Sequence, residues 1–314
     1  MSSSETNSEP KVPGRTIGFS IMSVATLFVV FFLSQQSATE FSGSADSLAI
    51  SNTNGFSAEQ WFLPDDDSLG FVEIPAGPFI MGSNPSLDRM AYENERWSNT
   101  RRQGEVDLPR YYIARFETTV AQFAAYVEAT GANAAQVPLG GDGSLPVANV
   151  TWPQALAYAR WLDAQLRSSS STPAALRDFL ESGAAITLPS EAEWEKAARG
   201  TDGRVFPWRD ARAESIANFN AAAPRPVNAR QCNECAWGLN DMAGNVWEIT
   251  RSPLQDYPYN EADDASDLAS DALYVMRGGS FADGLNNIRT AVRGAVDPGV
   301  RNPSIGFRVV ISTR

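Results

Sequence analysis

The chain has 314 residues, 43% of them hydrophobic, and a formal net charge of −12. This length and composition suit one large domain or two ordinary ones with a sizeable buried core. The strong negative charge disfavours binding to the phosphate backbone of DNA or RNA, so no nucleic-acid partner is expected. Histidine is absent, which excludes Ser-His-Asp and Cys-His catalytic pairs, histidine-held non-haem iron and most zinc enzymes.

The N-terminus contains the clearest local signal. Residues 17–34, IGFSIMSVATLFVVFFLS, carry no charge and would span about 27 Å as a helix, enough for the core of a bilayer. Because Lys11 and Arg15 precede this run, we expect a cytoplasmic tail at 1–16, a transmembrane signal anchor at 17–34, and the remaining chain outside the cytoplasm, in the periplasm of a Gram-negative cell. The alternative is a cleaved signal peptide, although no convincing cleavage site follows Ser34.

Residues 35–66 are rich in Ser, Asn and Gly. Such a composition predicts a flexible linker between the membrane and a folded domain at 67–314. The domain opens with the alternating pattern FVEI at 71–74, which is typical of a strand and is followed by Pro and Gly residues.

Three helix starts share one pattern, a hydroxyl residue with Gln or Glu three positions later. In such a capping box the hydroxyl accepts from the third amide, and the Gln or Glu side chain returns to the cap residue. The pattern predicts helices that begin after Thr119, Thr151 and Ser190, and Gly131 and Gly200 end the first and the third. Turn residues dominate after Gly200, so we expect short strands and long loops there.

Residues 277–294, RGGSFADGLNNIRTAVRG, have the composition of a functional loop. Two glycines are followed by polar residues and by two arginines four positions apart, with Asp283 as the only acid and no cysteine. A guanidinium can tie loops to carboxylates or carbonyls in a domain with little secondary structure. The arginines expected to have this architectural role are Arg277, Arg289, Arg293 and Arg308.

Eight blocks in order give the sequence a family signature. They are IPAGPFIMGS, ARFETTVAQFAAYVEATG, LPVANVTWPQALAYARWLD, ITLPSEAEWEKAARG, GRVFPW, GLNDMAGNVWEIT, MRGGSF and NPSIGFRVV. From about residue 67 to the C-terminus the chain resembles the formylglycine-generating enzyme family, also called the sulfatase-modifying factor domain. The resemblance implies an α/β fold, an elaborated C-type-lectin-like domain with little regular secondary structure.

The resemblance also implies what chemistry to look for. Catalytic members bind copper(I) through two cysteines just after the GGS-type segment and use O2 to oxidise a sulfatase cysteine to formylglycine. Here Asp283 lies roughly where the first of these cysteines falls, and no cysteine follows Cys235. Copper(I) is soft and prefers thiolates to carboxylate or amide oxygens. We therefore expect no copper and no cysteine-oxidase activity. The branch that forms carbon–sulfur bonds with histidine-bound iron is excluded because histidine is absent.

The stretch NDMAGNVWE at 240–248 resembles the calcium loop of the family, and calcium in a structural role is the expected cofactor. Calcium takes six to eight oxygen ligands, backbone carbonyls included. The ligands implied by position are the Asp241 side chain and the carbonyls of Met242, Gly244 and Val246. A second, weaker site would use Asn218 and the carbonyl of Phe219, but the stretch AAAPRPV that follows is short and lacks the acid that completes it.

Cys232 and Cys235 form a C-x-x-C pair. In an oxidising compartment a local disulfide would tighten the loop before the predicted calcium motif. A redox-active or metal-binding pair and two free thiols are the alternatives.

The middle of the C-terminal loop, ADGLNN, is where function would differ between family members. Asp283, Asn286 and Asn287 offer an acid and two amides that can hydrogen-bond a peptide backbone or pair with a basic side chain. The alternative is that the loop is only a solvated turn.

The function expected from these features is that of a membrane-anchored, extracytoplasmic binding or regulatory module of the cell envelope. The groove of the catalytic members holds an extended peptide, so the expected partner is an extracytoplasmic peptide or protein. One alternative is an oxidase or maturase that uses a different metal. Another is a diversified lectin-like binding protein whose variable residues lie in the C-terminal loop.

Overall fold

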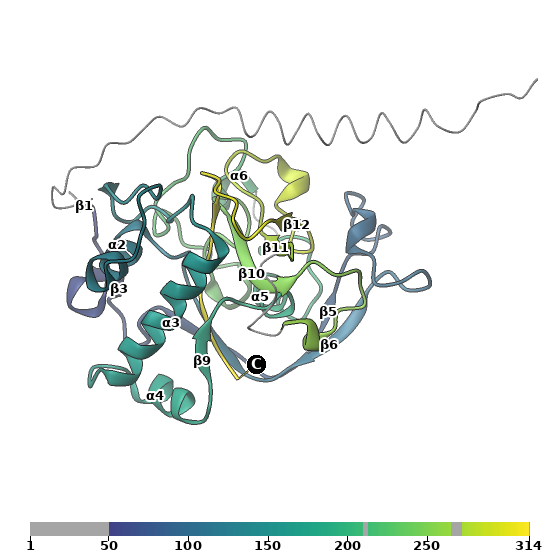
Figure 1. Cartoon of the computed structure of the whole chain (residues 1–314). Coiled ribbons are helices and arrows are strands. Elements are labelled where there is room, and N and C mark those ends of the chain that lie inside the picture. The colour runs from purple at the N-terminus through teal and green to yellow at the C-terminus, as the bar shows by residue number, and fades with distance from the viewer. Residues whose placement is uncertain (1–49, 210–212, 265–271, 314) are drawn as a thin grey trace, which may run out of the picture. The chain divides into compact units, whose positions relative to one another are not determined.

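The computed structural model describes residues 50–209, 213–264 and 272–313. The predicted cytoplasmic tail and the apolar run at 17–34 lie outside the described residues. No helix in the described part of the chain is long and apolar enough to cross a membrane. The described elements, drawn in Figure 1, form a mixed α/β architecture of short strands, helices and long loops, as the sequence predicts.

All three predicted helix starts are confirmed. Thr119, Thr151 and Ser190 are N-caps, and each has both hydrogen bonds of the capping box. The first helix ends at Gly131, whose φ of 66° is the left-handed conformation that glycine adopts at little cost. The helices are α2 (Val120–Thr130), α3 (Trp152–Ser168), α4 (Ala174–Glu181), α5 (Glu191–Arg199) and α6 (Ala213–Ile216).

Two four-stranded sheets carry much of the strand structure. The first, in the order β4-β7-β14-β9, is antiparallel throughout, and α3 lies beside its strand β9 (Figure 1). Its strands are β4 (Phe71–Ile74), β7 (Tyr111–Ala114), β14 (Val310–Ser312) and β9 (Ala185–Thr187). In the second sheet, β12-β11-β10-β13, only the pair of β10 and β13 is parallel. Its strands are β12 (Arg293–Val296), β11 (Tyr274–Arg277), β10 (Trp247–Pro253) and β13 (Ile305–Gly306).

The remaining elements are two-stranded pairs and short 3-10 helices. The strands are β1 (Ile50–Ser51), β2 (Phe56–Ser57), β3 (Leu63–Pro64), β5 (Gly77–Met81), β6 (Gly104–Leu108) and β8 (Gly141–Asp142). The 3-10 helices are η1 (Ala58–Gln60), η2 (Glu93–Glu95), η3 (Ala236–Gly238), η4 (Glu261–Asp264) and η5 (Leu285–Asn287).

The folded domain begins earlier than the sequence predicts. Residues 50–66, expected to lie in the flexible linker, instead pair and pack: β1 runs parallel to β8, and β2 is antiparallel to β3. Phe56 and Leu63 of this segment are buried. Burial of such side chains offsets the entropy of ordering the chain, even where the overall composition is polar. The linker prediction is therefore corrected for residues 50–66.

Helix α5 is buried along its whole length although most of its side chains are charged. It packs against β5, β10 and β11. Carboxylates inside a core need partners because their desolvation is costly, and here arginines supply them. The pairs are Glu191 with Arg277 and Arg293, Glu193 with Arg251, and Glu195 with Arg199 and Arg277. These pairs fix the second sheet and the loop after β11 around one helix.

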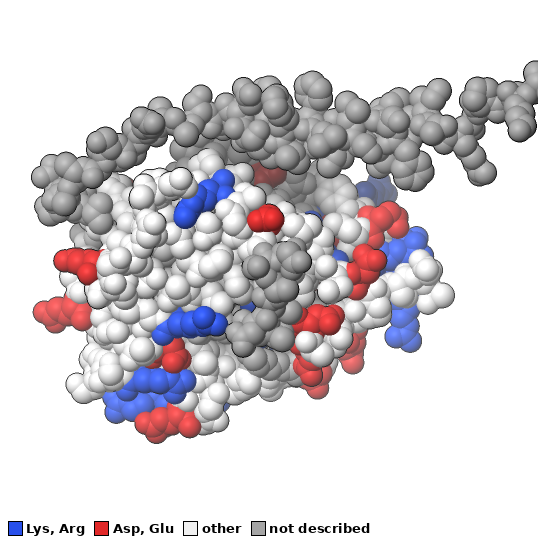
Figure 2. Space-filling view, viewed as in Figure 1, with Lys and Arg blue, Asp and Glu red and all other residues white. Residues whose placement is uncertain are grey.

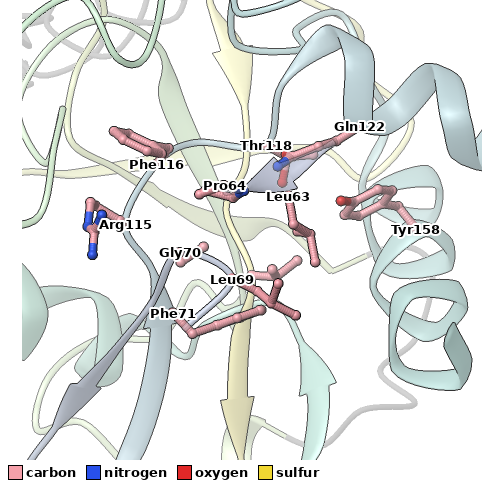
Figure 3. A pocket seen from close by; sticks show the side chains of 12 residues that line it. Leu63, Pro64, Leu69, Gly70, Phe71, Arg115, Phe116, Thr118, Gln122 and Tyr158 are labelled. Atoms are coloured by element: carbon pink, nitrogen blue, oxygen red, sulfur yellow. The ribbon is translucent and has the colours of Figure 1, made fainter. Parts of the chain in front are cut away.

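An apolar pocket lies where the N-terminal segment meets the first sheet and α3 (Figure 3). Leu63, Phe71 and Tyr158 are among the side chains that line it. Two of its polar members are engaged inside the domain: Gln122 donates to a backbone carbonyl, and Arg115 forms an ion pair with an aspartate. The pocket reflects packing of the N-terminal segment against the first sheet and α3.

Candidate functional site

The C-terminal loop, residues 277–294, joins β11 to β12, which pair as an antiparallel hairpin. Gly278 and Gly279 have φ values of 94° and 72°, in the left-handed region. A Cβ added at Gly279 would lie 2.5 Å from the carbonyl oxygen of Asn287. Glycine is thus required here because the loop folds back onto its own start.

Asp283 is bonded inside the loop instead of pointing to a ligand. Its carboxylate accepts from the Trp247 indole (2.9 Å), from the backbone and hydroxyl of Ser280 (3.0 and 2.6 Å), and from the Asn287 amide (3.0 Å). The Asn287 side-chain oxygen accepts from the hydroxyl of Tyr92 (2.8 Å). A recognition role for Asp283 and Asn287 stays a prediction that this geometry disfavours, because both side chains are already hydrogen-bonded within the domain.

Each of the four arginines expected to be architectural is buried and paired with a carboxylate. Arg289 lies 2.6 Å from Glu95 and 2.5 Å from Asp88, and Arg308 lies 2.6 Å from Glu248. Burial by itself lowers the pKa of the Arg308 guanidinium, but the carboxylates of Glu248, Glu117 and Asp241 together outweigh burial and hold this pKa above its usual value. Arg277 pairs with Glu191 and Glu195 of α5, and Arg293 pairs with Glu191.

Three segments that the sequence marks separately lie side by side in the structure. Gly244 donates its amide to the carbonyl of Gly278, and Asn245 donates to the carbonyl of Asn218, both at 2.8 Å. A Cβ at Gly244 would lie 2.3 Å from the Asn218 oxygen, so this approach also requires glycine. The chain just after Asn218 donates in turn to the carbonyl of Asp283. The three segments are 218–221, the Asp241 loop at 240–248 and the C-terminal loop.

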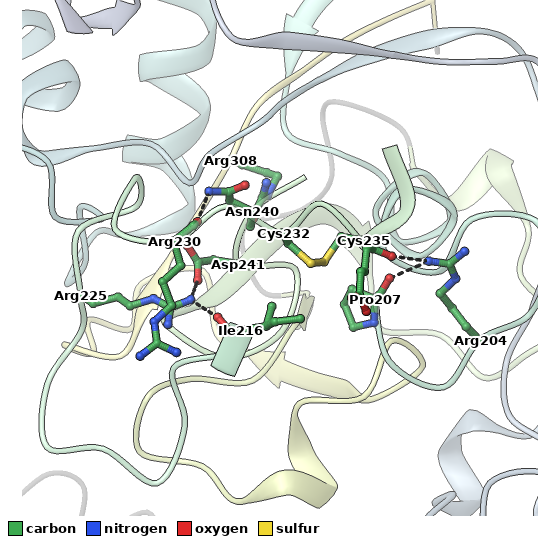
Figure 4. Close-up of a disulfide and its surroundings, with 11 residues drawn as sticks. Arg204, Pro207, Ile216, Arg225, Arg230, Cys232, Cys235, Asn240, Asp241 and Arg308 are labelled. Atoms are coloured by element: carbon green, nitrogen blue, oxygen red, sulfur yellow. Dashed lines mark hydrogen bonds and ion pairs between the residues drawn. A yellow bond between two sulfur atoms is a disulfide. The ribbon is translucent and has the colours of Figure 1, made fainter. Parts of the chain in front are cut away.

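The Asp241 carboxylate faces a guanidinium. Arg225 Nη2 lies 2.7 Å from Asp241 Oδ1 and also donates to the carbonyl of Ile216 (Figure 4). The side-chain oxygen of Asn245 accepts from the Asn218 amide (3.1 Å) and from the Arg225 backbone (2.9 Å). The only carboxylate of the predicted calcium ligands is thus already paired with an internal cation, and in this arrangement the ligand set does not fit calcium. Calcium binding stays a prediction that this geometry disfavours.

A second carboxylate, Glu117, lies against the Asp241 loop and accepts hydrogen bonds from a backbone amide and an asparagine side chain of that loop. Burial raises the pKa of Glu117 well above its usual range, and the charges of Asp241 and Glu248 raise it further. Burial also raises the pKa of Asp241, although two arginines oppose the shift. The side chains of the predicted ligands Met242 and Val246 are buried in the core, so only their carbonyls could serve an ion.

Cys232 and Cys235 form a disulfide. Both are buried and pack with Trp208 and Ile288 in a small hydrophobic cluster, against which Phe219 is partly buried (Figure 4 shows the bond). Ile288 belongs to the C-terminal loop, so the cluster joins the disulfide to the underside of that loop. The disulfide therefore stabilises the segment that leads into the Asp241 loop.

The solvent-facing side chains of the site come mainly from η5 and from the segment before η2. Asn286 is exposed, and Leu285 and Tyr92 are 37% and 44% exposed. No group of three or more acidic or cysteine side chains able to hold a metal ion occurs among the described residues. Acidic and basic side chains are interspersed on the described part of the face in Figure 2. The exposed side chains around η5 thus present apolar and amide groups to solvent.

Three residues of the site are missed by the sequence reasoning. Trp247 belongs to the NVWE block, and an aromatic residue there predicts packing in the core but not a hydrogen bond to Asp283. Arg225 lies in AAAPRPV, a stretch notable in the sequence for an acid that it lacks. Tyr92 lies in a segment without a recognisable pattern. Each acts through a partner distant in sequence, and such pairing leaves no local signal.

With the fold and these contacts described, comparison with known proteins identifies the family. The family model of the sulfatase-modifying factor enzyme 1-like domain matches residues 64–313. The chain belongs to this family.

Relatives in the family have different activities. The chain is 27% identical to hercynine oxygenase of Mycolicibacterium smegmatis, over 74% of this chain and 56% of that protein. It is 27% identical to formylglycine-generating enzyme of Streptomyces coelicolor, over 76% of this chain and 88% of the enzyme. It is 30% identical to inactive C-alpha-formylglycine-generating enzyme 2 of Bos taurus, over 52% of this chain and 49% of that protein. The chain thus spans little more than half the length of the hercynine oxygenases that it matches.

Two solved structures share the fold. PvdO from Pseudomonas aeruginosa aligns with a TM-score of 0.60 at 24% identity, and it covers 77% of this chain and 94% of its own. Treponema denticola variable protein 1 aligns with a TM-score of 0.57 at 24% identity, with the same coverage. At this identity the similarity shows the fold alone.

Proposed function

We propose that this domain is a binding module that holds a peptide or protein partner of the cell envelope and does not oxidise cysteine. The observation that carries the proposal is the position of Asp283. The resemblance to catalytic members places a copper-binding thiol there, whereas in this chain the carboxylate is fully engaged in holding the loop. The only two thiols of the chain are joined to each other in a disulfide.

The binding surface in this proposal is centred on Leu285, Asn286 and Tyr92. These side chains are at least partly exposed, and internal contacts fix the loop beneath them. A preformed surface loses little entropy when it binds, which favours affinity. The family contains proteins named as enzymes and proteins named as inactive, so membership alone does not decide activity.

The binding arm of the test uses site-specific crosslinking in cells. A photoreactive amino acid replaces Asn286 in the full-length protein, and a matched control replaces Glu128, an exposed residue of α2. The expected result is a discrete crosslinked species from position 286 that disappears with Leu285→Asp and is not formed from position 128. Equal crosslinking from both positions, or none from position 286, would argue against the proposed surface.

The activity arm uses purified full-length protein, copper(I), O2 and a cysteine-containing sulfatase peptide. Mass spectrometry should detect no formylglycine, because the C-terminal loop has no thiolate to hold copper(I). Turnover of the peptide would overturn the proposal.

We further propose that residues 17–34 anchor the protein, with residues 50–314 outside the cytoplasm. The support is the uncharged apolar run behind Lys11 and Arg15. Protease added to spheroplasts should digest the domain from outside. A domain that stays protected until the membrane is disrupted would contradict this topology.

A further inference from the structure

Arg225 joins segments that are distant in sequence. Its guanidinium bonds the Asp241 carboxylate at 2.7 Å and donates to the carbonyl of Ile216. Its backbone amide donates to the side chain of Asn245 at 2.9 Å, and its carbonyl accepts from the same side chain at 3.3 Å. The Asp241 side chain is 1% exposed and that of Arg225 is 16% exposed, so the contact is largely shielded from water. A single residue thus connects the segment before Asn218 with the Asp241 loop.

These contacts are the kind that a bound cation makes. A calcium ion in a loop draws together a carboxylate and several backbone carbonyls from neighbouring segments. The Arg225 guanidinium contacts one carboxylate and one carbonyl, both through Nη2, whose two N–H groups can bond both acceptors at once. It therefore supplies a positive charge and bridging contacts at the carboxylate that the family resemblance assigns to calcium.

The charge balance of the surroundings supports this substitution. Glu117, Asp241 and Glu248 are buried near one another, with Arg225 and Arg308 as their guanidinium neighbours. Three carboxylates against two guanidiniums leave at most one excess negative charge. Removal of Arg225 would leave at most two excess negative charges in a site with little access to water, a state that a divalent cation would offset.

We propose that the Arg225 guanidinium replaces calcium at the Asp241 loop, so that this domain is held together there without a metal ion. The contact between Arg225 and Asp241 also predicts how the domain responds when Arg225 is removed. Truncation of Arg225 should open the Asp241 loop to calcium and should make the stability of the domain depend on it.

Thermal unfolding of the full-length protein tests this inference, with the melting temperature measured in EDTA and in excess calcium chloride. The wild-type melting temperature should be the same in both. Arg225→Ala should melt roughly 5 to 10 °C lower in EDTA, because a buried carboxylate loses its partner, and should recover most of that loss in calcium. The double variant Arg225→Ala/Asp241→Asn should show no calcium response, since the anionic ligand is gone.

Arg204→Ala is the matched control. Arg204 also forms an ion pair in the same region, with Asp202 at 2.8 Å, and has a similar exposure of 15%. This variant should lose some stability without gaining a response to calcium. If calcium raised the melting temperatures of Arg225→Ala and Arg204→Ala by the same amount, calcium would be acting at a site other than the Asp241 loop.

Three results would overturn the inference. The first is a wild-type melting temperature that is higher in calcium than in EDTA, together with no such difference in Asp241→Asn. This result would show that the wild-type protein binds calcium through Asp241. The second is a folded Arg225→Ala whose melting temperature is the same in EDTA and calcium. If Arg225→Ala does not fold in EDTA, refolding in calcium decides: recovery of the folded state supports the inference, and failure in both conditions overturns it.

Discussion

The clearest consequence of the structure concerns Asp283, because sequence and geometry assign it opposite roles. As a free recognition residue, Asp283 could be truncated without loss of stability. In the structure its carboxylate collects four donors from Trp247, Ser280 and Asn287 and so fixes the turn of the C-terminal loop. Asp283→Ala should therefore destabilise the domain.

The size of the effect follows from the donors that lose their acceptor. A hydrogen bond to a charged group contributes about 1.5 to 3 kcal/mol, and a donor that stays buried without a partner costs about 1 to 3 kcal/mol. The four bonds are not additive, since one residue supplies two of them and the loop is partly exposed, so water can replace some of them. We expect a loss of about 3 kcal/mol, or a fall of roughly 6 to 12 °C in melting temperature for a domain of this size.

The assay is a comparison of thermal unfolding among Asp283→Ala, Asp283→Asn and Asn286→Ala. Asn at position 283 keeps one acceptor oxygen and loses the charge, so its melting temperature should lie between those of wild type and Asp283→Ala. Asn286 is exposed, and its truncation should change the melting temperature by no more than about 1 °C. An Asp283→Ala protein that has the melting temperature of wild type but fails to capture a partner would refute the role of Asp283 in holding the C-terminal loop.

The remaining predictions concern buried charge, the disulfide and pH. Arg289→Ala should cost about 3 to 5 kcal/mol in denaturant unfolding, because Glu95 would be left buried without its partner; a loss under about 1 kcal/mol would contradict the pairing. Reduction of the bond between Cys232 and Cys235 should lower the free energy of unfolding by about 2 kcal/mol or less, since the closed loop is short, and a much larger loss would show that the bond restrains more than this loop. Burial raises the pKa of Asp264 from 3.8 to about 6, so the folded state keeps a proton that the unfolded state has already lost. Its stabilising contribution is complete below about pH 4 and is lost as the pH rises through about 6, with an upper limit of about 3 kcal/mol that the partial exposure of the side chain reduces. Asp264→Asn should remove this pH dependence of unfolding, and an unchanged slope would exclude Asp264 as its source.

The parts of the fold that the sequence predicts well are those whose interactions are local. The capping boxes at Thr119, Thr151 and Ser190 each involve four consecutive residues, so their geometry can be deduced from spacing alone. The partners of the buried arginines cannot be deduced in this way. Arg289 and Glu95 are 194 positions apart, and only the assembled fold brings them together.

In the candidate site, too, the sequence predicts local features but not the contacts between distant residues. The sequence marks the loops around Asp241 and Asp283 but does not reveal that their acids have internal partners. Arg225 is a single arginine between two prolines, and nothing within a few residues of it indicates a contact 16 positions away. The domain begins earlier than the sequence predicts for a related reason. The composition of residues 50–66 is polar, whereas their ordering depends on a few buried side chains such as Phe56.

The buried ion pairs help to hold the proposed recognition surface in a domain with short strands. Arg289 bonds the backbone of the C-terminal loop and also binds Glu95, and its guanidinium lies 5.2 Å from the ring of Tyr92. The Tyr92 hydroxyl in turn holds Asn287. These contacts use the backbone and the inward-facing side chains of the loop, while Leu285 takes part in none of them and is partly exposed. Leu285 can therefore change without disturbing the contacts that position the loop, whereas Tyr92 is partly exposed and also supports the loop. A side chain that is exposed and not used for support, such as Leu285, is the kind that a binding role can vary.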